Sequence, residues 1–160
     1  MKFRVGFGSD THPLQEGKEL IIGGVKIPHY KGSVGHSDAD VLIHAICDAC
    51  LGAAGLRDIG THFPDDQEVY QGIESKILLE RTVAIIEKEG WKIVNIDSTI
   101  HLEKPKISEF IPGIKKILSE VLGIDLQDIA IKAKTSEKLG FVGREEGIRA
   151  EAIILIQSEK

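Results

Sequence analysis

The sequence predicts an α/β fold of the α+β kind, a two-layer sandwich in which a mixed four-stranded sheet carries helices on one face. Segments with strand periodicity alternate with longer segments of helical periodicity, which is typical of such layered folds. Three helical patterns are long enough to cover one face of a sheet. The length of 160 residues is that of one domain, residues 1–160, and neither a repeat nor a low-complexity linker divides it.

Four segments are expected to form the sheet, because they alternate apolar and polar residues or are short apolar runs between turn residues. They are residues 2–9, 92–102, 129–134 and 148–157. The second of these alternates most regularly, with Ile96 and Ile100 on one face and polar side chains on the other. A separate hairpin is expected where Gly23-Gly24 joins two apolar triplets.

Three further segments place apolar residues at the helical spacing of three and four. They are residues 38–51, residues 75–89 and a segment around 114–122. Ser37 and Asp40 form an S-x-x-D capping signature at the first helix, and a glycine follows each of the other two. Residues 28–35 and 52–72 are expected to be loops, and an ordered connection as long as the second is usually functional.

The sheet face opposite the helices is expected to be half polar. Asp97 and Thr99 would lie there beside Arg149 and Glu151 of the last strand, together with the apolar Ile153. Such a surface suits neither a hydrophobic core nor contact with water alone. We therefore expect it to be buried between the subunits of an oligomer.

The composition argues against several classes of function. The formal net charge is −5 and no stripe of Lys or Arg is present, so neither nucleic acid nor a membrane surface is an expected partner. No apolar run approaches the about 20 residues of a membrane span, and no signal-peptide pattern opens the chain, so we expect a cytoplasmic protein. Cys47 and Cys50 lie in an apolar helical pattern without a second pair. This favours buried free thiols over a metal or redox site.

The most informative residues are Asp10, His12 and His44. Asp10 and His12 stand two apart at the end of the first strand, so their side chains should project from one face. His44 lies in the first helix. Three protein ligands would leave one position of a tetrahedral Zn²⁺ open for a reactant. The alternative is chance, because a D-x-H pair is common and most single histidines on helices bind nothing.

Neighbouring residues could assist such a site. Asp48 follows His44 by one helical turn and could accept the second imidazole N–H, as could Asp40 unless it caps the helix. His36 and Ser37 precede the helix, where free backbone N–H groups attract phosphate. The alternative for this pair is a capping serine and a histidine in a loop.

A second polar group follows the strand at residues 129–134. Thr135 and Ser136 offer hydroxyls to phosphoryl oxygens, and Glu137 could hold a hard cation such as Mg²⁺ against a diphosphate. The alternative is a solvated strand end. Gly6-x-Gly8 is not a dinucleotide fingerprint, because the third glycine and the following helix are missing.

Together these motifs resemble the 2-C-methyl-D-erythritol 2,4-cyclodiphosphate synthase family along essentially the whole chain. The matching segments are Gly8–His12, Ile22–Val25, His36–Asp40 with His44, Asp58–Gly60, Phe63–Asp65, Pro105-Lys106 and Thr135–Phe141. The resemblance implies conversion of 4-diphosphocytidyl-2-C-methyl-D-erythritol 2-phosphate to the cyclic diphosphate and CMP, in non-mevalonate isoprenoid biosynthesis. The substrate's own 2-phosphate would attack its β-phosphorus, a reaction that requires no nucleophile from the protein.

The resemblance also implies roles for particular residues. Zn²⁺ would be held by Asp10, His12 and His44, and Mg²⁺ or Mn²⁺ would associate with Glu137. The active sites would lie between neighbouring subunits of a homotrimer, whose axial cavity is a candidate site for an isoprenoid diphosphate. His36 and Thr135 would be catalytic, as transition-state stabilisers.

Substrate contacts are expected in three groups of positions. The metal motifs supply Asp10, Thr11, His12, His36 and Ser37, and the erythritol phosphate would meet Asp58, Ile59, Gly60, Phe63, Pro64, Asp65, Asp66 and Gln67. The cytidine and diphosphate pocket would be lined by Leu102, Glu103, Lys104, Pro105, Lys106, Ile107, Ser108, Lys134, Thr135, Ser136 and Glu137. Phe141 and Arg144 also match substrate-contacting positions, and Arg144 is a further candidate for the axial cavity.

Two other functions remain open. A zinc phosphohydrolase of a nucleotide diphosphate would attack with metal-bound hydroxide and leave a water-derived oxygen in its product. A binding module for nucleotides or isoprenoid diphosphates would use its metal structurally, although structural zinc normally has four protein ligands. Protection of the fold by CMP or CDP with Mg²⁺ tests for nucleotide binding, and the product separates hydrolase from lyase.

Overall fold

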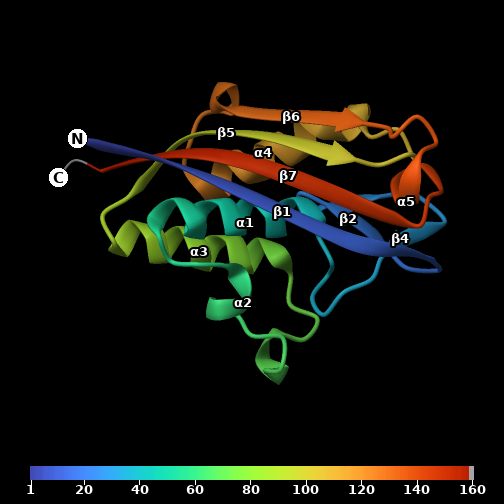
Figure 1. Cartoon of the computed structure of the whole chain (residues 1–160), viewed down its shortest axis with the longest axis horizontal. Coiled ribbons are helices and arrows are strands. Elements are labelled where there is room, and N and C mark those ends of the chain that lie inside the picture. The colour runs from blue at the N-terminus through green and yellow to red at the C-terminus, as the bar shows by residue number, and fades with distance from the viewer. Residues whose placement is uncertain (159–160) are drawn as a thin grey trace.

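A long first strand organises the sheet of this protein, for which a computed structural model describes residues 1–158. Strand β1 (Lys2–Glu16) runs antiparallel to the last strand, β7 (Gly147–Ser158), and pairs with it from Lys2 to Pro13. Strand β5 (Lys92–His101) lies antiparallel on the other side of β7, and β6 (Ile129–Lys134) is parallel to β5. The sheet is therefore mixed, as predicted (Figure 1).

The sheet differs from the prediction at its β1 edge. It has five strands in the order β4-β1-β7-β5-β6, because β4 (Lys31–Ser33), in a segment predicted to be a loop, pairs with Leu14–Glu16. The first strand was predicted to end at residue 9, yet it continues to Glu16. Asp10 and His12 thus lie inside a strand rather than at its end. Pairing with β7 and then β4 satisfies the backbone of this polar stretch, which has no apolar alternation to reveal it.

Three helices cover one face of the sheet, as predicted. Helix α1 (Val41–Ala54) lies along β1 and β7, α4 (Ile111–Leu122) lies beside β6, and α3 (Ser75–Lys88) packs on the other two helices (Figure 1). The buried side chains of β5 and β7 face these helices and include Ile96, Ile100 and Ile154. The predicted hairpin is present as β2 (Leu20–Ile22) and β3 (Val25–Ile27), and both glycines of its turn have positive φ.

The connection between α1 and α3 lies beside these two helices, on the side away from the strands (Figure 1). Helix α1 begins at Val41 rather than at residue 38 and ends before Gly55, which has a left-handed conformation. Helix α2 (Ile59–His62) and the 3-10 turn η1 (Glu68–Tyr70) follow. The other short helices are η2 (Ser108–Phe110), η3 (Leu126–Asp128) and α5 (Gly140–Gly143). Within residues 1–158, no helix is both long and apolar enough to cross a membrane.

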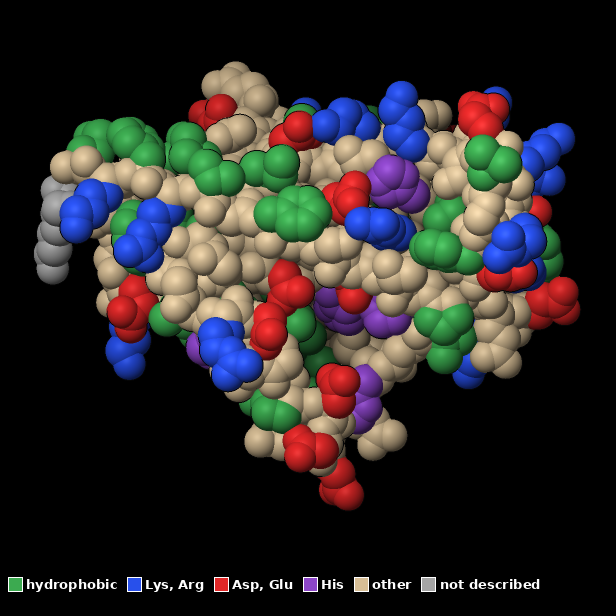
Figure 2. Space-filling view, viewed as in Figure 1, with side chains coloured by type: hydrophobic (Ala, Val, Ile, Leu, Met, Phe, Trp, Pro, Cys, Tyr) green, Lys and Arg blue, Asp and Glu red, His purple; other side chains and the backbone are tan. Residues whose placement is uncertain are grey.

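The sheet face opposite the helices carries large apolar side chains in contact with solvent. Phe3, Val5, Phe7 and Ile153 are 55%, 67%, 59% and 50% exposed. Figure 2 shows hydrophobic side chains gathered over the strands of this face. Lysines and carboxylates stand beside them, so the face is half polar, as predicted.

Candidate metal centre and active site

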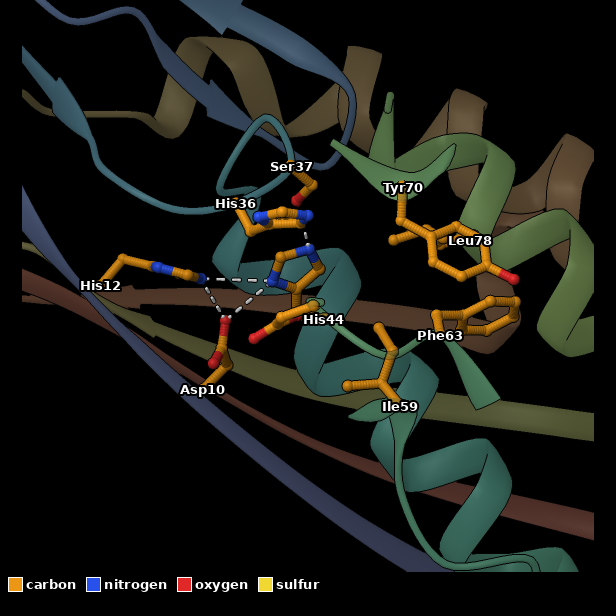
Figure 3. Close-up of a pocket in the computed structure, with 10 residues that line it drawn as sticks. Asp10, His12, His36, Ser37, His44, Ile59, Phe63, Tyr70 and Leu78 are labelled. Carbon is orange, nitrogen blue, oxygen red and sulfur yellow. Dashed lines mark hydrogen bonds and ion pairs between the residues drawn. The ribbon is translucent and has the colours of Figure 1, made fainter. Parts of the chain in front are cut away.

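Three side chains converge where β1 passes the start of α1 (Figure 3). Asp10 and His12 project from β1, and His44 projects from α1. The Oδ2 atom of Asp10 lies 2.8 Å from Nε2 of His12 and 3.1 Å from Nδ1 of His44, and these two nitrogens are 3.2 Å apart. Among the described residues, these three form the group of His, Cys, Asp or Glu side chains that could hold a metal ion, with one potential ligand atom from each lying within 4.8 Å of the others. The structure therefore brings together the predicted metal ligands.

Contacts on the outer side of each imidazole determine which nitrogen faces the centre. The Nδ1 atom of His12 lies 3.0 Å from the carbonyl oxygen of Val34, which can only accept, so Nδ1 donates and Nε2 is the nitrogen that faces Asp10. Nε2 of His44 lies 2.9 Å from the hydroxyl of Ser75 and 3.0 Å from that of Ser37. Two imidazole nitrogens and a carboxylate oxygen thus face one point, which fits a divalent metal ion.

The electrostatics of the centre also suit a cation. Burial by itself would raise the pKa of Asp10, but hydrogen bonds and charge from His12 and His44 lower the pKa of Asp10 to about 2. Burial by itself would lower the pKa of His12, yet the hydrogen bond to Asp10 leaves the pKa of His12 raised. The carboxylate is therefore ionised at neutral pH, and a metal ion would displace the proton that His12 attracts.

The predicted support of His44 by Asp48 is wrong. Oδ1 of Asp48 instead accepts a hydrogen bond from the backbone N–H of Ile59, at 2.8 Å, and so joins α1 to α2. Helical side chains lean toward the N-terminus of their helix, so the imidazole of His44 points away from a residue one turn later. The hydroxyls of Ser37 and Ser75 take the position that sequence reasoning gave to Asp48.

Asp40, rather than Ser37, caps α1. Its Oδ1 accepts hydrogen bonds from the backbone N–H groups of Ile43 and Gly23, at 3.1 and 2.9 Å, and its Oδ2 accepts one from Gly24 at 2.7 Å. Burial raises the pKa of Asp40 to about 6, although these N–H groups favour the ionised form. The carboxylate joins the hairpin turn to the helix start, and the helix then carries His44 one turn further on.

A cavity of about 170 Å³ opens beside the metal ligands. Figure 2 shows histidine side chains at the edge of a hollow, and Figure 3 shows the side chains around it. Its lining consists of Asp10, His12, His36, Ser37, His44, Ile59, Phe63, Asp65, Tyr70 and Leu78. Tyr70 and Leu78 were not predicted. Tyr70 packs edge-on against Phe63 with ring centroids 5.5 Å apart, and an aromatic residue in an otherwise polar loop was the available signal.

A second cavity, of about 190 Å³, lies between the loop after β5 and the end of β6. Its lining consists of Leu102, Glu103, Pro105, Lys106, Ile107, Ser108, Ala133, Lys134 and Thr135, of which Ala133 was not predicted. The backbone N–H of Leu102 donates to the carbonyl oxygen of Lys134 at 2.9 Å, and the Lys104-Pro105 peptide bond is cis. Two lysines beside apolar side chains such as Pro105 and Ile107 suit a ligand with a flat ring and an anionic group.

Glu103 holds the turn that follows β6. Its Oε2 and Oε1 atoms accept hydrogen bonds from the backbone N–H groups of Ser136 and Lys138, at 2.9 and 3.1 Å. Within this turn Glu137 and Lys138 have φ values of 51° and 62°, a left-handed conformation that non-glycine residues adopt rarely. Two backbone donors on one carboxylate therefore fix the position of Glu137, whose own side chain is exposed.

The remaining predicted contacts lie outside the lining of both cavities. They are Thr11, Asp58, Gly60, Pro64, Asp66, Gln67, Lys104, Ser136, Glu137, Phe141 and Arg144. Arg144 is exposed and is paired with Glu146, with 2.9 Å between Nε and Oε1. The two cavities are also separate, because paired strand residues lie between them. Arg149 of β7 pairs with Thr11 of β1 on one side and with His101 of β5 on the other. One chain does not unite all the predicted residues.

An α/β domain that presents two imidazoles and a carboxylate at the wall of a cavity defines a metal-binding protein of the enzyme type. The chain belongs to the YgbB family, whose family model matches residues 3–157. It is 60% identical over 156 residues to a protein of Bacteroides fragilis named 2-C-methyl-D-erythritol 2,4-cyclodiphosphate synthase, and the match covers 98% of each chain.

Two solved structures share the fold. IspF of Plasmodium falciparum in complex with CDP is 38% identical, with a TM-score of 0.86, and the match covers 99% of this chain and 97% of that one. The bifunctional IspDF of Campylobacter jejuni is 35% identical with a TM-score of 0.94. The match covers 98% of this chain and 42% of the bifunctional one, so this chain corresponds to part of that protein.

Proposed function

We propose that this chain converts 4-diphosphocytidyl-2-C-methyl-D-erythritol 2-phosphate to 2-C-methyl-D-erythritol 2,4-cyclodiphosphate and CMP, as a phosphorus-oxygen lyase of non-mevalonate isoprenoid biosynthesis. The observation that carries the proposal is the convergence of Asp10, His12 and His44 in a member of the YgbB family. A relative with 60% identity over nearly the whole chain is named as this synthase. The oxygen of the 2-phosphate forms a bond to the β-phosphorus, and the bond from that phosphorus to the CMP oxygen breaks.

The donor set favours particular ions. Two imidazoles and one carboxylate suit Zn²⁺ with an open fourth position, whereas the exposed carboxylate of Glu137 suits a hard ion, Mg²⁺ or Mn²⁺, held together with a diphosphate. When bound, these ions supply positive charge that reduces the repulsion between the two phosphate groups. The chain itself contributes no covalent nucleophile to this scheme, because the attacking oxygen belongs to the substrate.

The two cavities correspond to the two ends of the substrate. The apolar wall and the lysines of the second cavity, Lys106 and Lys134, suit a cytosine ring and its phosphates. The first cavity holds the erythritol phosphate next to the metal ligands. His36 and Thr135 lie on the linings of the first and the second cavity, and they stabilise charge on the reacting phosphates by hydrogen bonding.

A homotrimer completes the site. The cavities are separate within one chain, so a substrate that spans both requires the first cavity of one subunit to meet the second cavity of a neighbour. The exposed apolar side chains Phe3, Val5, Phe7 and Ile153 supply a surface for such an association. Around a threefold axis this face also encloses a space in which an isoprenoid diphosphate could bind.

The first cavity favours intramolecular attack over attack by water. Ile59, Phe63, Tyr70 and Leu78 form an apolar wall facing the metal ligands (Figure 3). The connection that carries three of them, residues 59–70, acts as a lid that closes on the substrate. Exclusion of water and alignment of the two phosphates bring the reacting atoms together.

Turnover in ¹⁸O-labelled water tests this proposal against the zinc phosphohydrolase. Cyclisation transfers no oxygen from water, so mass spectrometry is expected to show an unlabelled cyclic diphosphate and unlabelled CMP. One ¹⁸O atom in a linear phosphate product would establish hydrolysis and overturn the proposal. A protein that binds CDP but forms no product with zinc and magnesium present would be a binding module.

A further inference from the structure

Asp38 links the start of α3 to the metal centre. Its Oδ2 accepts a hydrogen bond from the backbone N–H of Ser75, at 2.9 Å, and its Oδ1 accepts one from the Ser75 hydroxyl. Ser75 is the first residue of α3 and is fully buried. Its Oγ atom also lies 2.9 Å from Nε2 of His44. A continuous series of contacts thus runs from Asp38 through Ser75 to a candidate metal ligand.

The chemistry of these groups sets the direction of each hydrogen bond. A carboxylate has no hydrogen to donate, so the Ser75 hydroxyl gives its single hydrogen to Asp38. The Ser75 oxygen can then only accept from His44, which places the imidazole hydrogen on Nε2. The other nitrogen, Nδ1, lies 3.1 Å from Asp10 and is the atom left to bind a metal ion.

We propose that Asp38 and Ser75 are positioning residues that hold His44 in the Nε2–H tautomer and so prepare its Nδ1 atom for a metal ion. This inference rests on the metal site of the proposed function. Asp38 acts only through Ser75, because its carboxylate is one hydrogen bond removed from the ligand. Partners that fix the tautomer of a ligating histidine typically change metal affinity by about 10–100-fold.

Two alternative explanations, capping of α3 by Asp38 and support of His44 by Ser37, do not account for all of these contacts. Capping of α3 would require the bond from the backbone N–H of Ser75 to Asp38, but it does not require the hydroxyl bond that leads to His44. The hydroxyl of Ser37 also lies near Nε2 of His44, at 3.0 Å. It accepts from the N–H of Ala39 at 3.3 Å, and its own hydrogen can point to Nε2 or to the Ser75 oxygen, 3.4 Å away, so it is compatible with either tautomer.

The segment from His36 to Asp38 also holds the end of the connection between α1 and α3, part of which is proposed to act as a lid. The carbonyl oxygen of His36 accepts a hydrogen bond from the N–H of Gly72 at 3.0 Å. Asp38, two residues later in the chain, accepts the bond from the N–H of Ser75 at the start of α3. The lid and the ligand His44 therefore share one support. Loss of the Ser75 hydroxyl would disturb the ligand and leave both backbone attachments in place.

Zinc affinity, measured by chelator competition on metal-free protein, tests the inference. Ser75→Ala removes the hydroxyl but keeps the backbone bond to Asp38. Asp38→Asn has an amide that can donate to the Ser75 oxygen and free the serine hydrogen to point at His44. Each variant is expected to bind zinc about tenfold more weakly or worse. Ser119→Ala is the matched control, because that hydroxyl bonds the carbonyl oxygen of Ile124, at 2.6 Å, at the end of α4.

The double variant tests whether Asp38 acts through Ser75. If it does, the double variant loses no more affinity than the weaker-binding single variant, because both changes interrupt one path. Losses that add, or single variants that bind zinc as the wild type does, would overturn the inference. A purely structural role of Asp38 in capping α3 predicts additive losses.

Nitrogen NMR of metal-free wild-type protein with ¹⁵N-labelled histidine gives a second readout that needs no variant. The inference predicts that Nε2 of His44 carries a hydrogen, also where Asp10 accepts a second one from Nδ1, and that Asp38→Asn lowers the occupancy of hydrogen at Nε2. An Nε2 atom of His44 without a hydrogen in the wild type would overturn the inference. A wild type that binds no zinc would refute the metal assignment of the proposed function instead, and the NMR result would still decide the tautomer.

Discussion

Gly8 of β1 lies so close to Ala45 of α1 that a Cβ atom at Gly8 would stand 1.9 Å from the carbonyl oxygen of Ala45. Gly6 has the same relation to Ala49. The two glycines let the helix rest on the backbone of the strand. Because Asp10 follows Gly8 by two residues and His44 precedes Ala45, this close approach sets the distance between the ligands from the strand and from the helix.

Gly8→Ala is expected to lower the free energy of unfolding by about 2 kcal/mol or more, because the methyl group must push α1 away from β1. Zinc affinity is expected to fall with it, since the ligands move apart. Urea unfolding and chelator competition measure the two effects. Gly52→Ala is the control: it is exposed on α1, where the nearest atom outside the helix backbone, the carbonyl oxygen of Phe7, is 4.0 Å from the added Cβ. It should be neutral or stabilising, and equal stability of both variants would contradict the account.

His44→Ala and Asp48→Asn separate a ligand from a neighbour. His44→Ala is expected to abolish zinc binding because it removes one of three ligands. Asp48→Asn is expected to leave zinc affinity well short of the about 10–100-fold loss typical of a group that supports a ligand, since Asp48 bonds Ile59. Metal analysis after dialysis checks both. Full zinc content in His44→Ala would remove His44 from the site, and a large loss in Asp48→Asn would restore the sequence-based assignment.

Glu103→Ala is expected to weaken CDP binding in the presence of Mg²⁺ by about tenfold, which corresponds to one lost hydrogen bond to a charged group. The turn from Thr135 to Lys138 loses its acceptor for two N–H groups and no longer presents Glu137 in one position. Glu103→Gln keeps one acceptor oxygen and should lie between the two. Isothermal titration measures the affinities, with the exposed Glu109→Ala as control. Unchanged CDP affinity in Glu103→Ala would show that the turn holds without it.

The two cysteines are expected to be inert in the folded protein. Burial raises the pKa of the Cys47 thiol to about 12 and raises that of Cys50 well above its ordinary value. Little thiolate is therefore present at pH 8, and iodoacetamide should modify neither thiol until the protein is denatured. Mass spectrometry after native and denaturing alkylation counts the adducts. Modification of either thiol in the native protein at the rate of free cysteine would mean that the C-x-x-C is accessible and reactive.

Periodicity predicted the helices, the hairpin and the four long strands of the sheet, because each pattern depends on residues close in sequence. It did not predict β4 or the continuation of β1 to Glu16. Those residues are mostly polar and do not alternate with apolar ones, and their strand conformation depends on backbone pairing between Leu14–Glu16 and Lys31–Ser33. Backbone pairing of this kind leaves little trace in the order of apolar residues.

The metal ligands were predictable because Asp10 and His12 are two apart and His44 has a recognisable helical context. Their supporting contacts were not. Ser75 lies 31 residues after His44, and only the packing of α3 against α1 brings its hydroxyl to the imidazole. Asp48 is adjacent on a helical wheel, but the imidazole of His44 points away from it and Asp48 bonds Ile59 instead. The separation of the two cavities was equally hidden, because it depends on the register of three strands.

The most direct test of the central claim is ³¹P NMR of the zinc- and magnesium-loaded protein with 4-diphosphocytidyl-2-C-methyl-D-erythritol 2-phosphate, with His44→Ala in parallel. The account predicts that the wild type yields CMP and a cyclic diphosphate and that the variant yields neither. A linear product opened by water would identify a hydrolase. No turnover by the fully loaded wild type would contradict the catalytic role assigned to the Asp10, His12 and His44 centre.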